Sequence, residues 1–395
     1  MGYFSNRDIH RLAVHAVIGT LGGGLSYAFS AVFLIHAGLA LAQVFLAFAA
    51  ILALRFVMRP LVLIAVPAIG LRGAFILGSA LTALACPALA LVDGVGVALG
   101  AYLLICALGQ VFYCTCYHVF FSGLGDSSRR GSQIGLFQAL GALAACLGPG
   151  IGGILLTFFG PWATFGTAFV VGLAAIVPIV GITEPPLARV TPKGAYAAAK
   201  IGARLYFADG WIQVSLTTAW SIVMFQALGN RYDSFGGTLS LAALAGAIGG
   251  MVLGRFIDKG HGRKAVWINA AILAGGLVLR SLAVGHAAAV IAVAAGAALL
   301  SGIYLPSWMT PAYNAAKNSP CMLRFQFAAE AGWDIGGVCA GVIAAVICVF
   351  GLSMAAAILL ALPMVLVQAL LLDRGYTRQW AARESGALAT RSSPL

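Results

Sequence analysis

Runs of about 20 apolar residues recur along this chain from Arg11 to Leu372, and this recurrence restricts its possible folds more than any other feature. A helix of about 20 residues crosses the roughly 30 Å hydrocarbon core of a bilayer. Hydrophobic residues make up 62% of the 395 residues and charged residues only 9%, whereas a soluble domain carries about a quarter charged residues. The first run, 12–35, is too long for the apolar core of a cleavable signal peptide, and the alternating segments of a membrane β-barrel are absent. The sequence therefore predicts an all-α membrane protein with many spans.

The polar segments between these runs divide the chain into twelve expected helices. Their ranges are 11–36, 39–68, 74–92, 95–122, 132–158, 161–182, 201–228, 234–256, 266–285, 288–315, 324–350 and 352–372. The longest connection begins at Thr183 and carries prolines and charges. We therefore expect an N-terminal six-helix bundle over 1–183, a cytoplasmic linker over 184–200, a C-terminal six-helix bundle over 201–372 and a cytoplasmic tail over 373–395.

Basic residues gather on one side of this arrangement. With the N-terminus inside, all but four of the 23 lysines and arginines fall in inside segments. The exceptions are Arg231, in an outside loop, and Arg55, Arg59 and Arg280, within spans. Because cytoplasmic loops are rich in lysine and arginine, the net charge of +12 is mainly a topology signal. It predicts that both termini are cytoplasmic, and it gives no indication of nucleic-acid binding.

The two halves repeat one another at a shared offset. Gly70-Leu-Arg72 follows the second expected helix, and Gly262-Arg-Lys264 follows the eighth, 192 positions later (262 − 70 = 192). Gln138 lies at the same offset from Glu330 in the corresponding helix. A shared offset favours a duplicated six-helix unit, and secondary transporters are commonly built from such repeats.

The loop "GRFIDKGHGRK", which starts at Gly254, is one of the few charged stretches of the chain. It resembles the loop signature of the major facilitator superfamily, in which a glycine precedes an acidic–basic pair and a Gly-basic-basic triplet. The residues that match, and that the resemblance implies form a conformational latch, are Gly254, Asp258, Lys259, Gly262, Arg263 and Lys264. A carboxylate at a helix end can accept hydrogen bonds from a neighbouring helix N-terminus, which gives such a latch a physical basis.

Two further segments bear on this resemblance. The first copy of the loop, "VPAIGLRGA", keeps Gly70 and Arg72 but lacks the aspartate. The segment "GALAACLGPGIGG", 141–153, looks like the Gly-Pro-rich motif of the family's antiporters. The resemblance implies twelve transmembrane helices in two pseudo-symmetric bundles, a monomer in the lipid bilayer, and a small-molecule substrate moved by alternating access.

Four charged residues are expected deep in the membrane. Arg55 and Arg59 lie four residues apart in "ILALRFVMRPLV", and Glu330 and Asp334 lie four apart in "RFQFAAEAGWDI", so each pair shares a helix face. In the family that the chain resembles, helices 2 and 11 pack together. We therefore expect the acids to pair with the arginines, to gate the cytoplasmic side and to include the proton-coupling site.

Other polar residues within the spans are candidates for a substrate cavity. Asp209 lies early in the seventh expected helix. The remaining candidates come from helices 4, 5 and 10 and are Tyr117, His118, Gln138, Tyr304 and Trp308.

These residues favour a secondary transporter of the bacterial inner membrane, with the proton as coupling ion. The deep arginines favour an anionic solute, because guanidinium binds carboxylate and phosphate bidentately, but this inference fails if Glu330 and Asp334 occupy them. The alternative is proton-driven efflux of a drug-like or cationic compound held by Glu330, Asp334 or Asp209. Soft-metal transport through Cys114 and His118 and a non-transporting sensor are minor alternatives. The chain lacks GxSxG, HExxH and P-loop motifs, so we expect neither an enzyme nor a cofactor or metal.

Overall fold

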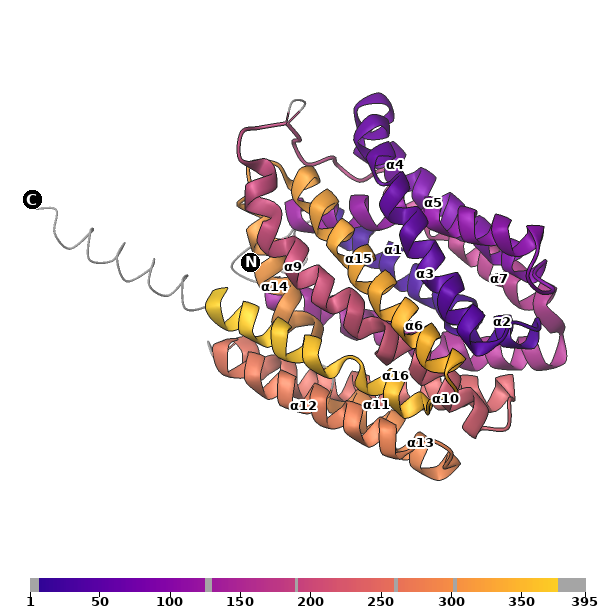
Figure 1. Cartoon of the computed structure of the whole chain (residues 1–395). Helices are drawn as coiled ribbons and strands as arrows, with labels where there is room; N and C mark the ends of the chain where they lie inside the picture. The colour runs from indigo at the N-terminus through magenta and orange to yellow at the C-terminus, as the bar shows by residue number, and fades with distance from the viewer. Residues whose placement is uncertain (1–6, 125–129, 189–190, 259–261, 301–303, 376–395) are drawn as a thin grey trace, which may run out of the picture.

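The computed structural model describes residues 7–124, 130–188, 191–258, 262–300 and 304–375, and every regular element in them is helical (Figure 1). The helices are α1 (Arg7–Leu25), α2 (Ser30–His36), α3 (Leu41–Met58), α4 (Pro60–Ala90), α5 (Val97–Leu124), α6 (Arg130–Phe158), α7 (Gly160–Ala174), α8 (Ile176–Ile179), α9 (Ala195–Gln213), α10 (Trp220–Ala227), α11 (Tyr232–Asp258), α12 (Gly262–Leu282), α13 (Ala287–Leu300), α14 (Tyr304–Lys317), α15 (Met322–Val349) and α16 (Met354–Leu359), with a further helical stretch over 362–375. The 3₁₀ turn η1 (Tyr27–Phe29) and the π-helical segment η2 (Val214–Ala219) interrupt two of the spans.

Among the described residues, nine helical segments are long and apolar enough to cross a membrane. Each of the twelve expected ranges contains helix, so the all-α architecture is confirmed, while the count of twelve spans stays a prediction. The boundary of the seventh expected helix was misplaced, because α9 begins at Ala195, within the expected linker. The ends of α2 and α10 and the start of α16 lie at the opposite end of the molecule from the linker (Figure 1).

The expected loop between the second and third helices is a single-residue break. Gly70 has φ 77° and ψ 163°, inside a helix that otherwise runs from Pro60 to Ala90. Beyond the break, the backbone N–H groups of Leu71 and Arg72 donate to the carboxylate of Glu184, at 3.2 and 3.1 Å. This carboxylate satisfies the free amides of a helix start. The linker thus supplies the acid that the first loop copy lacks.

Irregular turns interrupt the first span of each half at corresponding levels. The first span breaks at η1, after the glycines of "GGGLSY", and the seventh widens into η2 between α9 and α10. Shifting the π-helical segment back by the repeat offset of 192 places it over 22–27, where it meets the start of η1 (214 − 192 = 22). Interruptions of this kind are frequent at functional sites in membrane helices.

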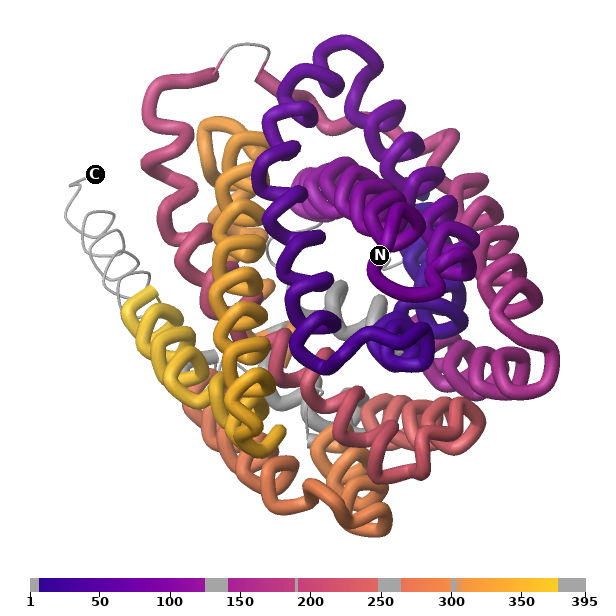
Figure 2. The backbone as a smooth tube through the Cα atoms, turned by 45° about the vertical axis from the view of Figure 1, so that its right-hand side comes forward, coloured from indigo at the N-terminus to yellow at the C-terminus, as the bar shows by residue number. Residues whose placement is uncertain are grey.

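Helix α15 is packed between α9 and α3, which are far from one another in sequence (Figures 1 and 2). Gly332 and Gly336 of α15 face the backbone of α9, so closely that an added Cβ would overlap the carbonyl oxygens of Ala203 and Phe207. On the other side, a Cβ at Gly337 would overlap the side chain of Leu52 in α3. Small residues let membrane helices approach in this way, and here they bring α15 close to both neighbours.

This packing generates a stability prediction. We expect Gly332→Ala and Gly336→Ala each to lower the free energy of unfolding by about 1–3 kcal/mol, because the methyl group must displace the α9 backbone. The matched control is Gly275→Ala in α12, where an added Cβ meets no atom within 4 Å. There the higher helix propensity of alanine should leave stability unchanged or raise it by up to about 1 kcal/mol. Thermal unfolding of the purified protein measures the three effects, and equal melting temperatures for all three variants would contradict the packing.

Candidate functional site

Arg55 and Arg59 lie on the second span, in the interior of the molecule. Arg59 is fully buried, and its backbone is helical at φ −55° and ψ −36°, so the span continues through Pro60. Counting back from the break at Gly70, Arg59 lies 11 residues in and Arg55 lies 15 residues in (70 − 59 = 11, 70 − 55 = 15). At about 1.5 Å per residue, these positions correspond to depths of roughly 16 and 22 Å.

Glu330 and Asp334 of α15 meet these arginines in a four-residue charge cluster. Arg55 Nη2 donates to Glu330 Oε2 at 2.9 Å, and Arg55 Nε lies 3.0 Å from Asp334 Oδ1. Arg59 pairs with Asp334 through Nη2 and lies 3.9 Å from Glu330. The exposed fraction of these side chains is 4% or less. The sequence-based pairing of the helix 2 arginines with the helix 11 acids is therefore present in the structure.

Side chains on α5 and α14 add further hydrogen bonds to the charge cluster. Arg55 Nη1 donates to Gln110 at 2.8 Å, and Arg59 Nη1 donates to Thr115 at 3.1 Å. His118 Nε2 lies 3.2 Å from Glu330 Oε1, and its Nδ1 lies 2.5 Å from the hydroxyl of Tyr313. With a proton on Nε2 the imidazole donates to the carboxylate, and its Nδ1 bonds to the hydroxyl.

The charge cluster is electrically balanced. Two guanidinium groups face two carboxylates, and a neutral His118 leaves this balance unchanged. One unpaired charge in a bilayer costs several kcal/mol, so removing any single member leaves an uncompensated charge among buried groups. The balance stabilises contact between a helix of the first half and a helix of the second.

A second polar group lies beside the charge cluster in the C-terminal half. Asp209 is buried, and its two carboxylate oxygens accept from the hydroxyl of Tyr304 and from Trp333 Nε1, the latter at 2.9 Å. The guanidinium of Arg55 lies 5.0 Å from the centre of the Trp333 ring. Trp333 therefore connects Asp209 to the charge cluster through one hydrogen bond and one cation–π contact.

Two other sequence candidates lie in aromatic contacts next to these groups, and Tyr117 packs edge-on against His118. Tyr117 stacks on Tyr113, and Trp308 packs edge-on against Tyr206. The side chain of Gln138 lies outside the described residues. The expected latch spans the end of α11 at Asp258 and the start of α12 at Gly262. Of the latch side chains, the structure describes only that of Lys264, which is exposed. Within the described part of the chain, no three His, Cys, Asp or Glu side chains gather as metal ligands.

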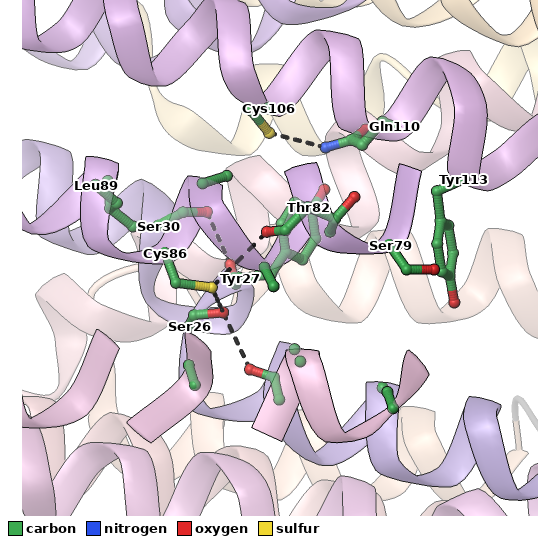
Figure 3. Close-up of a pocket in the computed structure, with 18 of the residues that line it drawn as sticks. Ser26, Tyr27, Ser30, Ser79, Thr82, Cys86, Leu89, Cys106, Gln110 and Tyr113 are labelled. Atoms are coloured by element: carbon green, nitrogen blue, oxygen red, sulfur yellow. Dashed lines mark hydrogen bonds between the residues drawn. The ribbon is translucent and has the colours of Figure 1, made fainter. Parts of the chain in front are cut away.

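A pocket of about 280 Å³ adjoins the charge cluster (Figure 3); the sequence predicted cavity residues on the fourth expected helix, which supplies part of its wall, and missed the other walls. Its walls come from α1, η1, α4, α5 and α7, and include Tyr27, Ser79, Thr82, Gln110 and Tyr113. The sequence signals that could have found it are a histidine in an apolar run, at His15, and the glycines and serines of "GTLGGGLSYAFS".

The charge cluster predicts strong coupling between partners on different helices. Arg59→Met and Asp334→Leu should each cost about 3–5 kcal/mol of unfolding free energy, because each leaves a buried charge unpaired. The double variant should recover most of this loss. Lys200→Met, at an exposed position of α9, should change stability by less than about 0.5 kcal/mol. Thermal unfolding of the four variants measures the coupling, and simple additivity of the two single losses would show that the pair is not coupled.

Comparison with known proteins gives the fold. No protein family and no curated protein matches the chain by sequence. Among solved structures, the human organic anion transporter MFSD10 (TETRAN) matches with a TM-score of 0.66 at 15% identity, covering 94% of this chain and 100% of that one. The E. coli fucose:proton symporter FucP matches with a TM-score of 0.63 at 15% identity, covering 93% and 98%. FucP in its outward conformation gives a TM-score of 0.62. This chain is therefore an integral membrane protein with the major facilitator superfamily fold.

Proposed function

We propose that this protein is a secondary active transporter that moves a small solute by alternating access. The observation that carries the proposal is the charge cluster of Arg55, Arg59, Glu330 and Asp334, which joins α3 to α15. A purely structural contact between apolar helices needs no ion pairs, and well-packed apolar side chains serve as well or better. A contact that must form and separate repeatedly benefits from charges that water can solvate when the halves part.

Protonation offers the means to separate the halves. If Glu330 or Asp334 takes up a proton, the charge cluster changes from two cations and two anions to two cations and one anion. The remaining imbalance weakens the contact between α3 and α15 and favours a state in which water reaches the arginines. We therefore propose the proton as coupling ion and this pair of acids as its site, with His118 adjacent to Glu330.

The identity of the solute is not set by the arginines. The preference for an anion depended on free guanidinium groups, yet both arginines are engaged by acids and by neutral acceptors on α5. Two neighbours with this fold are named as an organic anion transporter and a fucose:proton symporter, so the fold itself accommodates both anionic and neutral solutes. Cation efflux through Asp209 finds little support, since this carboxylate is buried and both its oxygens are already bonded.

The positive-inside pattern orients the proposed transporter with its linker and both termini in the cytoplasm of a bacterial cell. The charge cluster then lies in the half of α15 nearer the cytoplasm, 8 to 12 residues from its start at Met322 (330 − 322 = 8, 334 − 322 = 12). Its pairing holds the cytoplasmic side closed, and its separation opens that side.

The test is transport by the purified protein in proteoliposomes under an imposed pH gradient. The vesicles are incubated with a defined mixture of small neutral, anionic and cationic compounds, and the accumulated compounds are identified by mass spectrometry. We expect at least one compound to accumulate relative to protein-free vesicles and to lose this accumulation when the gradient is collapsed. In Glu330→Gln, gradient-driven accumulation should fall at least about tenfold, the equivalent of one pK unit of coupling free energy.

Asp233→Asn is the matched control, because Asp233 pairs with the exposed Arg231 at a helix start, away from the charge cluster. This variant should transport like the wild type. The absence of accumulation or exchange of every compound, in either direction of the gradient and with folded protein, would exclude transport. Accumulation that is indifferent to the pH gradient would retain transport and exclude the proton.

A further inference from the structure

The pocket beside the charge cluster belongs to the first half of the chain alone. Each lining residue falls between His15 and Ala175, on the spans that contain α1, α4, α5 and α7. The pocket is thus distinct from the contact between the halves. Its volume of about 280 Å³ equals that of roughly nine water molecules in the liquid. This space suits a compound with a single ring and is small for a drug-sized one.

The pocket wall carries no formal charge. Among the described residues, its lining includes no Asp, Glu, Lys or Arg, and the imidazole of His15 is buried. His15 Nδ1 lies 2.7 Å from the carbonyl oxygen of Ala175, which can only accept, so Nδ1 carries the proton and Nε2 holds a lone pair. The ring packs edge-on against Phe75. A charged solute would lose its hydration here without gaining a counter-ion, at a cost of several kcal/mol.

Three serine hydroxyls of the pocket wall can accept a hydrogen bond from a ligand. The hydroxyls of Ser26 and Ser30 (Figure 3) and of Ser79 donate to backbone carbonyl oxygens, so their oxygens keep lone pairs, although Ser26 Oγ also accepts from the thiol of Cys86. His15 Nε2 and Thr82 Oγ1 have no hydrogen-bond partner among the described residues. These two atoms are fully buried behind the wall, so the acceptors that the lining offers to a ligand are the serine oxygens.

Aromatic rings and bare backbone form the rest of the wall. Tyr27, Tyr102 and Tyr113 line the pocket, and Tyr27 keeps 53% of its surface exposed although it lies among transmembrane helices. On α1 the lining positions include Gly23, where an added Cβ would meet no atom within 4 Å. Flat apolar surfaces of this kind favour a ring that stacks between them.

We propose that this pocket binds an uncharged, single-ring aromatic solute that donates one or two hydrogen bonds, such as an aromatic alcohol or an N–H heterocycle. Its assignment as the site of the transported solute rests on the proposed transport function, whereas binding itself requires no transport.

Gln110 connects this pocket to the charge cluster. Its side chain lines the pocket, accepts a hydrogen bond from Arg55 and donates to Cys106, another lining residue (Figure 3). A solute that bonds to the Gln110 amide competes with Arg55 for it. Occupation of the pocket therefore changes the hydrogen bonding of the charge cluster directly, without a long chain of intermediates.

Four probes of one scaffold test the proposed class: benzyl alcohol, toluene, benzoate and benzylamine. A ligand that binds only the folded protein raises its melting temperature in a saturable way. We expect saturable stabilisation by benzyl alcohol, with half-saturating concentrations at least about tenfold higher for the two ions, since each 1.4 kcal/mol of lost affinity is tenfold. Toluene, which cannot donate, should bind more weakly than benzyl alcohol. Equal stabilisation by toluene and benzyl alcohol would overturn the hydrogen-bonding class and indicate an apolar occupant such as a lipid chain.

A pair of glycine variants separates binding in the pocket from partitioning into detergent. Gly23→Leu places a side chain in the open space of the pocket, whereas Gly166→Leu in α7 fills open space elsewhere. The benzyl alcohol effect should persist in Gly166→Leu and disappear in Gly23→Leu. Should Gly23→Leu not fold, Ser79→Ala removes an acceptor hydroxyl from the pocket lining and should weaken benzyl alcohol binding. If benzyl alcohol raised the melting temperature of the folded pocket variant as much as that of the wild type, the proposal would be overturned.

Cysteine modification gives an independent readout. Cys86 lines the pocket and Cys348 does not, and both are half-buried free thiols. Benzyl alcohol should slow the reaction of Cys86 with N-ethylmaleimide and leave that of Cys348 unchanged. Protection of Cys86 in a protein that transports nothing would retain the pocket and refute the transport function. The proposed pocket would be refuted, and transport retained, by two results together. Gly23→Leu would transport like the wild type, and benzyl alcohol would leave the rate of N-ethylmaleimide reaction unchanged at both Cys86 and Cys348.

Discussion

The burial of two arginines with two acids is the interaction on which the arrangement of this protein depends. Burying any one of these four charges alone in a bilayer would cost several kcal/mol, and pairing the arginines with the acids offsets that cost. The four-residue spacing on both α3 and α15 turns each pair toward the other helix, so that the two helices match in register as well as in charge. The position of α15 relative to α3 is therefore specified by electrostatics, while its position against α9 is specified by glycine packing.

Irregular backbone interrupts the described part of the bundle at three places that carry polar or backbone hydrogen-bonding groups. The first span breaks at η1 beside the pocket wall, and the seventh widens at η2 directly after α9. Gly70 and Glu184 form a third irregular place, where the linker caps the start of the helix beyond the break. The regular helices fix the spacing between the spans. The irregular segments expose backbone hydrogen-bonding groups inside the protein.

Much of the charge cluster could be predicted from sequence, because its signals are local and rare. Charged residues are scarce in this chain, so Arg55, Arg59, Glu330 and Asp334 stand out, and their spacing on a helix is read directly. The replacement of the missing loop aspartate by Glu184 could not be predicted, since it depends on where the linker returns in space. Most of the pocket was missed for a related reason. Its residues are ordinary serines, tyrosines and glycines, and only the packing of four spans leaves the space between them.

The sequence separation of the paired charges has a consequence for biosynthesis. Arg55 and Glu330 are 275 positions apart, so at about 5–20 residues per second the ribosome needs roughly 15–55 s to make the acid after the arginine. During that interval the first half must reside in the membrane with two deep cations. Gln110 and Thr115, only 55 and 56 positions later, are the partners that arrive early, and they bond the same guanidinium groups in the finished protein. The neutral acceptors on α5 are thus available to the arginines during insertion, before α15 is made and adds the two carboxylates.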